Sequence, residues 1–172
     1  MHLDDEKQSN ESSLEPQNDF ERKVVDYLSG LIERTGLYAR VVISYREENK
    51  LVLNMESEDS GILIGKRGQT LEALQLITNI YAGRIEKGNV RIIVDTQNYR
   101  SRRERSLIRF AHQAAEQVRR TGEPKLLEAM NPFERRLIHT ALSRADDIET
   151  SSEGDGLYKR IKIYSRKPNL RR

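Results

Sequence analysis

Two glycines and two cations stand together in the stretch Gly65, Lys66, Arg67 and Gly68, here named the GKRG loop. Glycine lets the backbone come close to a ligand, and the second glycine stands where a helix is predicted to begin. The unpaired N–H groups at a helix start, together with the positive end of the helix dipole, attract anions. The two side-chain cations add charge at the same place. The loop therefore predicts a binding site for a phosphate chain.

Residue spacing decides which phosphate ligand the loop fits. A nucleotide-triphosphate loop needs four residues between its glycines and a Ser or Thr after its Lys. Three residues separate Gly61 from Gly65, and Arg67 follows Lys66, so the triphosphate interpretation fails. A lone G-x-x-G pattern is more often a plain turn between two helices, and that alternative stays open at this point.

The segments around the loop predict a small unit of helices and strands. Apolar spacing predicts a helix from Asp19 that Gly36 ends, a strand hairpin over 38–55, and a third strand over 90–95. A short helix precedes the loop and a longer one follows it to Gly83. On the longer helix, the residues expected to face a core are Leu71, Leu74, Ile77 and Tyr81.

A long helix is predicted over 99–121. Its apolar stripe consists of Leu107, Phe110, Ala111, Ala114 and Val118. Arg102, Arg105 and Arg109 share one face with His112. A solvated face is the ordinary explanation for charged residues on a helix, but like charges at neighbouring helical positions repel each other. The arginine face therefore favours a polyanionic partner.

Capping signals predict a further helix in the stretch NPFERRLIHTALSR, residues 131–144. Asn131 suits the N-cap, Pro132 the first helical position, and Glu134 the third residue of a capping box. Arg135 and His139 lie four residues apart and share one face. The expected core residues are Leu137, Ile138, Ala141 and Leu142.

Short strands are predicted on both sides of this helix, over 125–130, 148–151 and 157–164. In the last strand, Leu157, Ile161 and Ile163 are expected to point one way. The residues expected to point the other way are Tyr158, Arg160, Lys162 and Tyr164. Alternating aromatic and cationic side chains suit contact with bases and phosphates, although edge strands also carry charge to stay soluble.

Composition excludes several functions. The chain has 172 residues and no Cys, which rules out disulfides, thiolate metal sites and Cys nucleophiles. It has three His, and none lies in a metal-ligand motif, so no catalysis, cofactor or metal is expected. No apolar run is long enough to span a membrane, and a cytoplasmic protein without membrane insertion is expected.

Charge is distributed unevenly along the chain. Residues 1–19 hold six acidic residues and one basic residue, a net charge of −5, although the whole chain carries +3. Residues 20–172 therefore carry +8. An acidic, apolar-poor leader is usually a disordered tail.

The motifs resemble two known modules. The order of elements over 20–96, with the GKRG loop, resembles a KH domain of the prokaryotic type, whose loop clamps single-stranded RNA by its backbone. The stretch NPFERRLIHTAL, after an arginine-rich helix, resembles the R-3-H domain, a small module that binds single-stranded nucleic acid and is named for an Arg and a His in this spacing. The two in succession, with the SEGDG turn, resemble the Jag family of bacteria over about 20–165.

The resemblance implies an α+β fold of two small domains, each a three-stranded sheet packed with helices. The expected division is a disordered acidic tail over 1–18, a KH domain over 19–97, an R-3-H domain over 98–166 and a basic tail over 167–172. Many family members carry a further N-terminal domain, which this protein is expected to lack, and functions that depend on that domain are not inferred.

The implied function is non-catalytic binding of single-stranded RNA, as a chaperone or post-transcriptional regulator, with single-stranded DNA as an alternative ligand. The expected RNA-binding residues are Ile64, Gly65, Lys66, Arg67, Gly68, Arg102, Arg105, Arg109, Arg135, His139, Arg160 and Lys162. For Arg135 and His139, the alternative is that they only order their helix and the neighbouring strand. The implied protein partner is a small single-KH protein or a second copy of this chain. A protein-binding adaptor, whose basic faces meet an acidic protein, is the alternative function.

Overall fold

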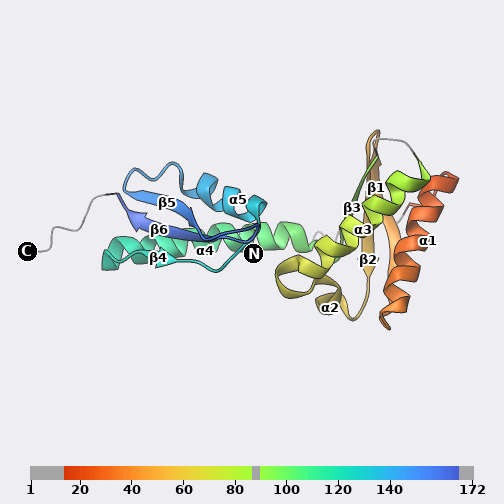
Figure 1. Ribbon diagram of the computed structural model, residues 1–172, viewed down its shortest axis with the longest axis horizontal. Helices are drawn as coiled ribbons and strands as arrows, with labels where there is room; N and C mark the ends of the chain where they lie inside the picture. The colour runs from red at the N-terminus through yellow and green to blue at the C-terminus, as the bar shows by residue number, and fades with distance from the viewer. Residues whose placement is uncertain (1–13, 87–89, 167–172) are drawn as a thin grey trace, which may run out of the picture. The chain divides into compact units, whose positions relative to one another are not determined.

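The computed structural model describes residues 14–86 and 90–166, which form two compact units divided after Tyr99. The first unit runs α1 (Asp19–Arg34), β1 (Arg40–Glu47), β2 (Lys50–Glu56), α2 (Ser60–Ile64), the 3₁₀ turn η1 (Lys66–Gly68), α3 (Gln69–Ile85) and β3 (Arg91–Asp95). The second runs α4 (Tyr99–Thr121), β4 (Lys125–Leu126), α5 (Pro132–Leu142), β5 (Ile148–Glu153) and β6 (Arg160–Ser165) (Figure 1). Each unit has one three-stranded sheet, which confirms the predicted α+β fold.

The first unit packs α1 and α3 against the sheet β1-β2-β3. β1 and β2 form the predicted antiparallel hairpin, in which Glu47 pairs with Lys50, and β3 lies parallel to β2. α1 begins after Asn18, whose side chain accepts a hydrogen bond from the Glu21 amide at 2.8 Å. It ends before Gly36, which has a φ of 80° that favours glycine.

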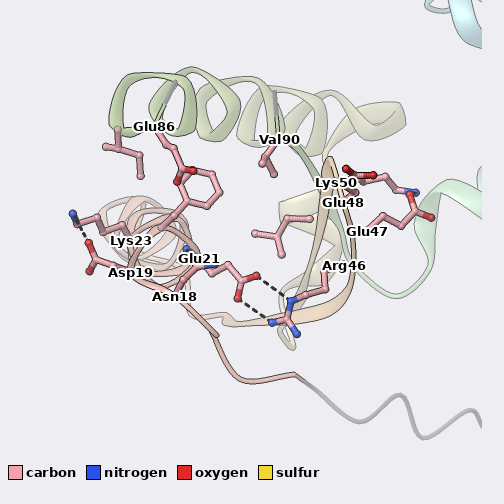
Figure 2. A pocket seen from close by; sticks show the side chains of 13 residues that line it. Asn18, Asp19, Glu21, Lys23, Arg46, Glu47, Glu48, Lys50, Glu86 and Val90 are labelled. Carbon is pink, nitrogen blue, oxygen red and sulfur yellow. Dashed lines mark hydrogen bonds and ion pairs between the residues drawn. The ribbon is translucent and has the colours of Figure 1, made fainter. Parts of the chain in front are cut away.

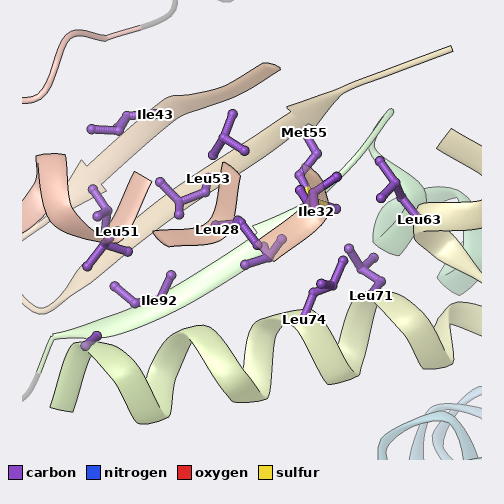
Figure 3. Packing of buried hydrophobic residues seen from close by; sticks show 14 residues of the cluster. Leu28, Ile32, Ile43, Leu51, Leu53, Met55, Leu63, Leu71, Leu74 and Ile92 are labelled. Atoms are coloured by element: carbon purple, nitrogen blue, oxygen red, sulfur yellow. The ribbon is translucent and has the colours of Figure 1, made fainter. Parts of the chain in front are cut away.

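The core of the first unit lies between the sheet and these two helices (Figure 3). β2 contributes Leu51, Leu53 and Met55, the alternate residues that the sequence predicts to point inward, and all three are buried. Leu28 and Ile32 of α1 pack against them. Burying one such side chain contributes about 1.5–3 kcal/mol to stability, so the alternation along β2 fixes which face of the sheet the helices cover.

On α3, the predicted core residues Leu71 and Leu74 are buried, which confirms the first half of the predicted line. Beyond them, the buried line continues through Thr78 and Ala82 and not through Ile77 and Tyr81. Thr78 can be fully buried because its hydroxyl donates to the Leu74 carbonyl at 2.7 Å, which satisfies its polar atom within the helix. Ile77 is 39% exposed as a result, and the prediction that it faces the core is wrong.

Tyr81, also predicted to face the core, is half-buried at the contact between α1 and α3. Its ring stacks on that of Tyr27, with ring centroids 3.9 Å apart and planes inclined by 3°. The aromatic pair joins the two helices outside the aliphatic core.

The described part of the predicted acidic tail, residues 14–18, contacts the first sheet. The Leu14 amide donates to the Ile43 carbonyl at 2.8 Å and forms a single antiparallel bridge to β1. Residues 1–13 lie outside the described residues, so the disorder predicted for them stays a prediction.

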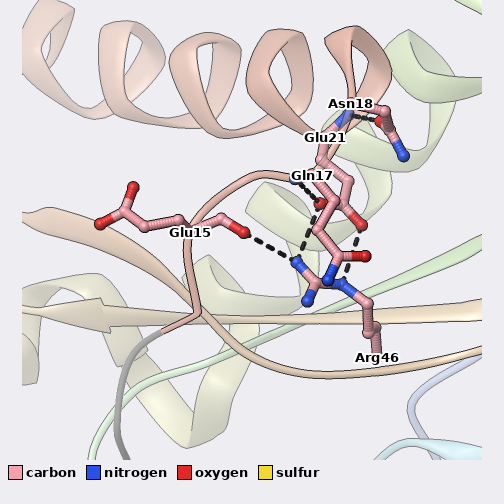
Figure 4. A network of polar contacts seen from close by, with 5 residues as sticks. All are labelled: Glu15, Gln17, Asn18, Glu21 and Arg46. Carbon is pink, nitrogen blue, oxygen red and sulfur yellow. Dashed lines mark hydrogen bonds and ion pairs between the residues drawn. The ribbon is translucent and has the colours of Figure 1, made fainter.

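Arg46 of β1 fixes this segment to the start of α1 (Figure 4). Its guanidinium donates to the Glu15 carbonyl at 3.0 Å and to both carboxylate oxygens of Glu21, at 3.0 and 2.9 Å. The Gln17 amide also donates to the Glu21 carboxylate at 2.7 Å. Glu21 is buried on the helix, and this shared network explains how its charge is compensated.

The second unit packs α4 and α5 against an antiparallel sheet of order β4-β6-β5. Ile161 and Ile163 of β6 are fully buried, as predicted. Ile138 of α5 packs into the same core. The buried residues of α4 are Leu107, Ala111, Ala114, Ala115 and Val118.

Two predicted core residues of the second unit are exposed. Phe110 is 42% exposed because it lies one residue before the buried Ala111, which turns it about 100° around the helix. Leu157 is 63% exposed because β6 begins at Arg160, so the inward alternation of the strand does not reach it. Both predictions are wrong.

The strand predicted over 125–130 is shorter than expected. β4 consists of Lys125–Leu126, which pairs with β6. Beyond it, the Leu127 amide donates to the Ile161 carbonyl at 2.7 Å, and Met130 forms a single bridge with Lys159. The segment before α5 therefore stays beside β6 without continuing as a regular strand.

The capping box predicted for α5 is confirmed. The Glu134 amide donates to Asn131 Oδ1 at 2.9 Å, and the Asn131 amide donates back to Glu134 Oε2 at 3.3 Å. Pro132 occupies the first helical position. This cap sets the start of the helix that carries Arg135 and His139.

No helix within residues 14–86 and 90–166 is long and apolar enough to cross a membrane. The same residues include no group of three His, Cys, Asp or Glu side chains arranged to hold a metal ion. The basic tail predicted for 167–172 lies outside the described residues.

Candidate nucleic-acid interface

The GKRG loop joins α2 to α3 through backbone conformations that are unusual for most residues. Gly65, Arg67 and Gly68 have φ values of 69°, 56° and 81°. A Cβ on Gly65 would lie 2.0 Å from Thr70 Oγ1, and one on Gly68 would lie 2.7 Å from Cε1 of Tyr99. Both glycines are therefore required by conformation and by space.

The loop presents its charge at the start of α3. Lys66 is exposed, Arg67 and Ile64 are half-buried, and Gly68 is buried. No side chain of the described residues caps the N-terminus of α3 through a hydrogen bond. Exposed Lys66 thus directly precedes the first-turn N–H groups of this 17-residue helix, an arrangement that suits a phosphate.

Several arginines of α4 line a groove or form ion pairs. Arg102, Arg105 and Arg109 are exposed and, together with Ile108, line a surface groove of about 500 Å³. Arg103 and Arg119 form ion pairs within the second unit. Arg103 donates to Glu134 at 2.7 Å, and Arg119 to Asp147 at 2.6 Å. The structure therefore brings together the three arginines predicted to share a face.

Arg135 holds two backbone carbonyls of its own unit. Its Nη1 donates to the Met130 carbonyl at 2.9 Å and to the Leu157 carbonyl at 2.8 Å. The half-buried side chain thus ties the start of α5 to the loop before β6. This geometry suits an ordering role, the alternative that the sequence left open.

His139 contacts two hydroxyls of β5. Its Nδ1 lies 2.6 Å from Thr150 Oγ1, and its Nε2 lies 3.2 Å from Ser152 Oγ. Partial burial lowers the pKa of His139 below its usual value, and the nearby positive charge of Arg135 lowers the pKa further. The neutral ring is therefore favoured, and its two nitrogens are engaged within the unit.

The predicted cations of β6 differ in their surroundings. Arg160 is exposed, and it is paired in register with Glu153 across the sheet. Lys162 forms an ion pair with Glu153 at 3.2 Å, and both side chains are partly exposed. Glu153 of β5 thus partly balances the charge of this strand.

A separate pocket of about 500 Å³ lies beside the start of α1 and the β1–β2 turn (Figure 2). Its charged lining residues are Asp19, Glu21, Lys23, Arg46, Glu47, Glu48, Lys50 and Glu86. Five of these are acidic and three are basic, so the pocket has no positive excess to attract a phosphate. It contains none of the predicted RNA-binding residues.

The sequence prediction missed Tyr99 as part of the loop region. Tyr99 is the first residue of α4, but its ring lies beside Gly68 and packs against the core of the first unit. No local pattern signals this contact because it joins positions far apart in the sequence. The hydrophobic periodicity of α4 indicates only which residues face its own core.

Comparison with known families gives the class of the protein. Residues 21–94 match the family described as KhpA/KhpB, KH domain, and residues 105–165 match the R-3-H domain. The fold and the two matches define a protein with a KH domain followed by an R-3-H domain.

Similar proteins give the family. The chain is 35% identical over 150 residues to the RNA-binding protein KhpB of Clostridium symbiosum, and the match covers 87% of this chain and 68% of that protein. It is 32% identical over 146 residues to KhpB of Lactiplantibacillus plantarum, covering 85% and 45% of the two chains. It is 36% identical over 124 residues to KhpB of Bacillus subtilis, covering 70% and 60%. The chain belongs to the KhpB family, also called the Jag family.

Proposed function

We propose that this protein binds single-stranded RNA without catalysing a reaction and grips the RNA backbone with the GKRG loop. The observation that carries the proposal is the geometry of the loop. Exposed Lys66 stands between two glycines of positive φ, directly before the uncapped start of α3. Backbone N–H groups and an ammonium at one place recognise phosphates without reading bases.

The exposed arginines of α4 provide a second RNA contact in this proposal. Arg102, Arg105 and Arg109 line one groove together with Ile108. Guanidinium groups bind phosphates bidentately and stack on bases. Arg160 and Lys162 of β6 are proposed as weaker contacts, because Glu153 lies beside both.

The cellular role that we propose is that of an RNA chaperone or post-transcriptional regulator in the cytoplasm. The relatives are named RNA-binding proteins, which supports RNA as the ligand. A surface that grips backbone phosphates acts on many sequences, as a chaperone requires.

The decisive test is the double variant Lys66→Asp with Arg67→Asp, titrated against labelled single-stranded RNA of about a dozen nucleotides. We expect binding to be lost, because the loop cations become anions beside the phosphate chain. The matched control is Arg22→Asp with Arg34→Asp, which makes the same change of net charge at exposed positions of α1. Circular dichroism checks that both variants fold. Unchanged affinity in the folded loop variant would contradict the proposed grip.

Two competitors separate the alternative ligands in the same assay. Single-stranded DNA of the same sequence tests whether the 2′-hydroxyl contributes. An acidic protein tests the adaptor alternative. If the basic surface binds proteins, an acidic protein with the same negative charge as the RNA should displace the RNA. We expect RNA to be retained against the acidic protein.

We further propose that α3 pairs with a second KH domain, from a small single-KH protein or another copy of this chain. The observation that favours this partner is an apolar stripe on α3. Leu76, Ile77 and Ile80 are 61%, 39% and 50% exposed and lie at helical neighbour positions. Large apolar side chains gathered on one helix face commonly mark a protein interface.

Sedimentation of the chain alone tests whether two copies associate. Sedimentation with a purified single-KH protein tests whether that protein is the partner. Ile80→Asp should abolish whichever association is seen, because it places a charge in an apolar contact. Tyr38→Asp is the control, since Tyr38 is 82% exposed and lies outside α3. Association that persists in Ile80→Asp would show that the apolar stripe is not the interface.

A further inference from the structure

The ring of Tyr99 occupies the space beside the second glycine of the GKRG loop. A methyl group on Gly68 would lie 2.7 Å from Tyr99 Cε1 and 3.3 Å from its Oη. Gly68 is both the last residue of η1 and the N-cap of α3. Tyr99 therefore contacts the loop at the position that sets the direction of the helix start.

The chain between β3 and α4 holds Tyr99 in this place. Thr96 is fully buried, and its hydroxyl donates to the Met55 carbonyl of β2 at 2.6 Å. The Tyr99 amide in turn donates to the Thr96 carbonyl at 2.9 Å. Between them, Gln97 and Asn98 have φ values of 50° and 52°, a left-handed conformation that reverses the chain. The sheet thus anchors the turn that aims the Tyr99 ring at Gly68.

The loop needs such support because its backbone is strained. Arg67 is a residue with a side chain in the left-handed region, at a φ of 56° and a ψ of 31°. Conformations of this kind persist where the surrounding structure holds them. Thr70 packs against Gly65 from within α3, and Tyr99 packs against Gly68 from outside the loop.

We propose that Tyr99 is a positioning residue for the RNA-binding loop and sets its affinity for a backbone phosphate without touching the RNA. The inference rests on the proposed function of the loop. With the ring in place, the N–H groups at the start of α3 are already oriented when the phosphate arrives. Without it, the loop spends part of its time in other conformations, and the apparent Kd rises as the competent fraction falls.

This role extends the KH module beyond its last strand. The family match ends at residue 94, but the first compact unit runs through Tyr99. The residue that supports the loop is also the first residue of α4. Correct folding of the α4 start is therefore a condition for phosphate binding at the loop.

The test uses the full chain with Tyr99→Leu, which keeps apolar bulk but removes the ring. We expect its Kd for the labelled RNA to rise about ten-fold, through loss of a preorganised loop. Tyr99→Phe keeps the ring over Gly68 and should restore most of the affinity. The matched control is Tyr81→Leu, which removes a half-buried tyrosine of the same unit that stacks on Tyr27. Urea unfolding measures the stability of all three variants.

A double-mutant cycle separates positioning from direct contact and from general destabilisation. Tyr99→Leu is combined with Lys66→Ala and Arg67→Ala, which weaken the loop without abolishing binding. If Tyr99 acts through the loop, its effect on Kd should largely disappear in that background. An undiminished effect there, or an equal loss of affinity in Tyr81→Leu, overturns the proposal. If the Lys66 and Arg67 changes alone leave Kd unaltered, it is the proposed function of the loop that fails.

A second measurement applies if Tyr99→Leu is too unstable for titration. Glycine-selective ¹⁵N labelling of the Tyr99→Phe and wild-type proteins reports the amides of Gly65 and Gly68 as RNA is added. If Tyr99→Phe preserves the RNA-induced shifts of both amides, the result agrees with the proposal that the ring of residue 99 holds the loop. A loss of these shifts in Tyr99→Phe, with the ring still present, contradicts it.

Discussion

Arg103 of α4 donates to the carboxylate of Glu134 on α5, with Nε 2.7 Å from Oε1. The same carboxylate completes the capping box through its other oxygen, which accepts from the Asn131 amide at 3.3 Å. Glu134 is 5% exposed, so both oxygens are satisfied within the protein. One buried side chain thus joins the arginine-rich helix to the helix that carries Arg135 and His139.

The Arg103–Glu134 pair predicts that replacing two arginines of α4 has different effects on the stability of the protein. Arg103→Ala should destabilise the protein by about 1–3 kcal/mol, because it leaves a buried carboxylate without its cation. Arg109→Ala, at an exposed position of the same helix, should change stability by less than about 0.5 kcal/mol. Urea unfolding curves measure both. Equal midpoints for the two variants would show that the Arg103–Glu134 pair contributes nothing to folding.

Arg135 should act mainly on stability. Arg135→Ala removes two hydrogen bonds from a charged donor to backbone carbonyls, and we expect a loss of about 1.5–3 kcal/mol. Arg135→Lys restores the charge but not the planar fork, so it should recover only part of that stability. Thermal melting and RNA titration over a range of salt concentrations are the measurements. A phosphate contact would instead flatten the salt slope by about 0.7 in Arg135→Ala and leave the melting temperature unchanged.

His139 should make stability depend on pH. Its pKa is lowered in the folded protein, chiefly by burial, whereas the unfolded chain titrates near the ordinary value of 6.5. The unfolded state therefore binds the proton more readily, and stability rises with pH through that interval. The contribution is fully present above about pH 6.5 and is lost as the pH falls through the folded pKa.

Urea unfolding between about pH 5 and 7.5 measures this dependence. His139→Gln can still hydrogen bond to Thr150 or Ser152, so it should flatten the pH profile while keeping much of the fold. His112→Gln, at an exposed position of α4, is the matched control for the loss of a histidine. A steep profile that survives in His139→Gln would assign the pH dependence to another group. The lowered pKa also means that any charge-dependent phosphate contact by His139 appears only below about pH 6.5.

The exposed arginines of α4 should control the salt dependence of RNA binding. For single strands, the slope of log affinity against log salt changes by about 0.7 for each phosphate neutralised. Replacing Arg102, Arg105 and Arg109 together by Ala should therefore flatten the slope by about 2. Arg119→Ala is the control on the same helix, since Asp147 and Glu116 hold its guanidinium. If both proteins show the wild-type slope, the arginine face does not contact phosphates.

Local sequence signals located most elements of this protein. The alternation of Leu51, Leu53 and Met55 identified β2 and its inward face, because a strand has a period of two. Asn131 and Glu134 located the start of α5, because a capping box is satisfied within four residues. The GKRG loop could be recognised from its residues alone, since its glycines and cations are contiguous.

Tertiary structure decided the features that depend on contacts between distant residues. Thr78 is buried in place of Ile77 because a threonine hydroxyl can be satisfied by its own helix, and the packing of α3 against the sheet selects that face. Arg135 and His139 share a helix face in the sequence, but their partners Leu157, Thr150 and Ser152 come from β5 and the segment before β6. The sequence by itself determined which residues carry the charge. Only the folded chain determined that Arg103 and Arg119 form ion pairs within the second unit. The same holds for the packing of the Tyr99 ring beside Gly68. Such contacts exist only when folding brings separate segments of the chain together.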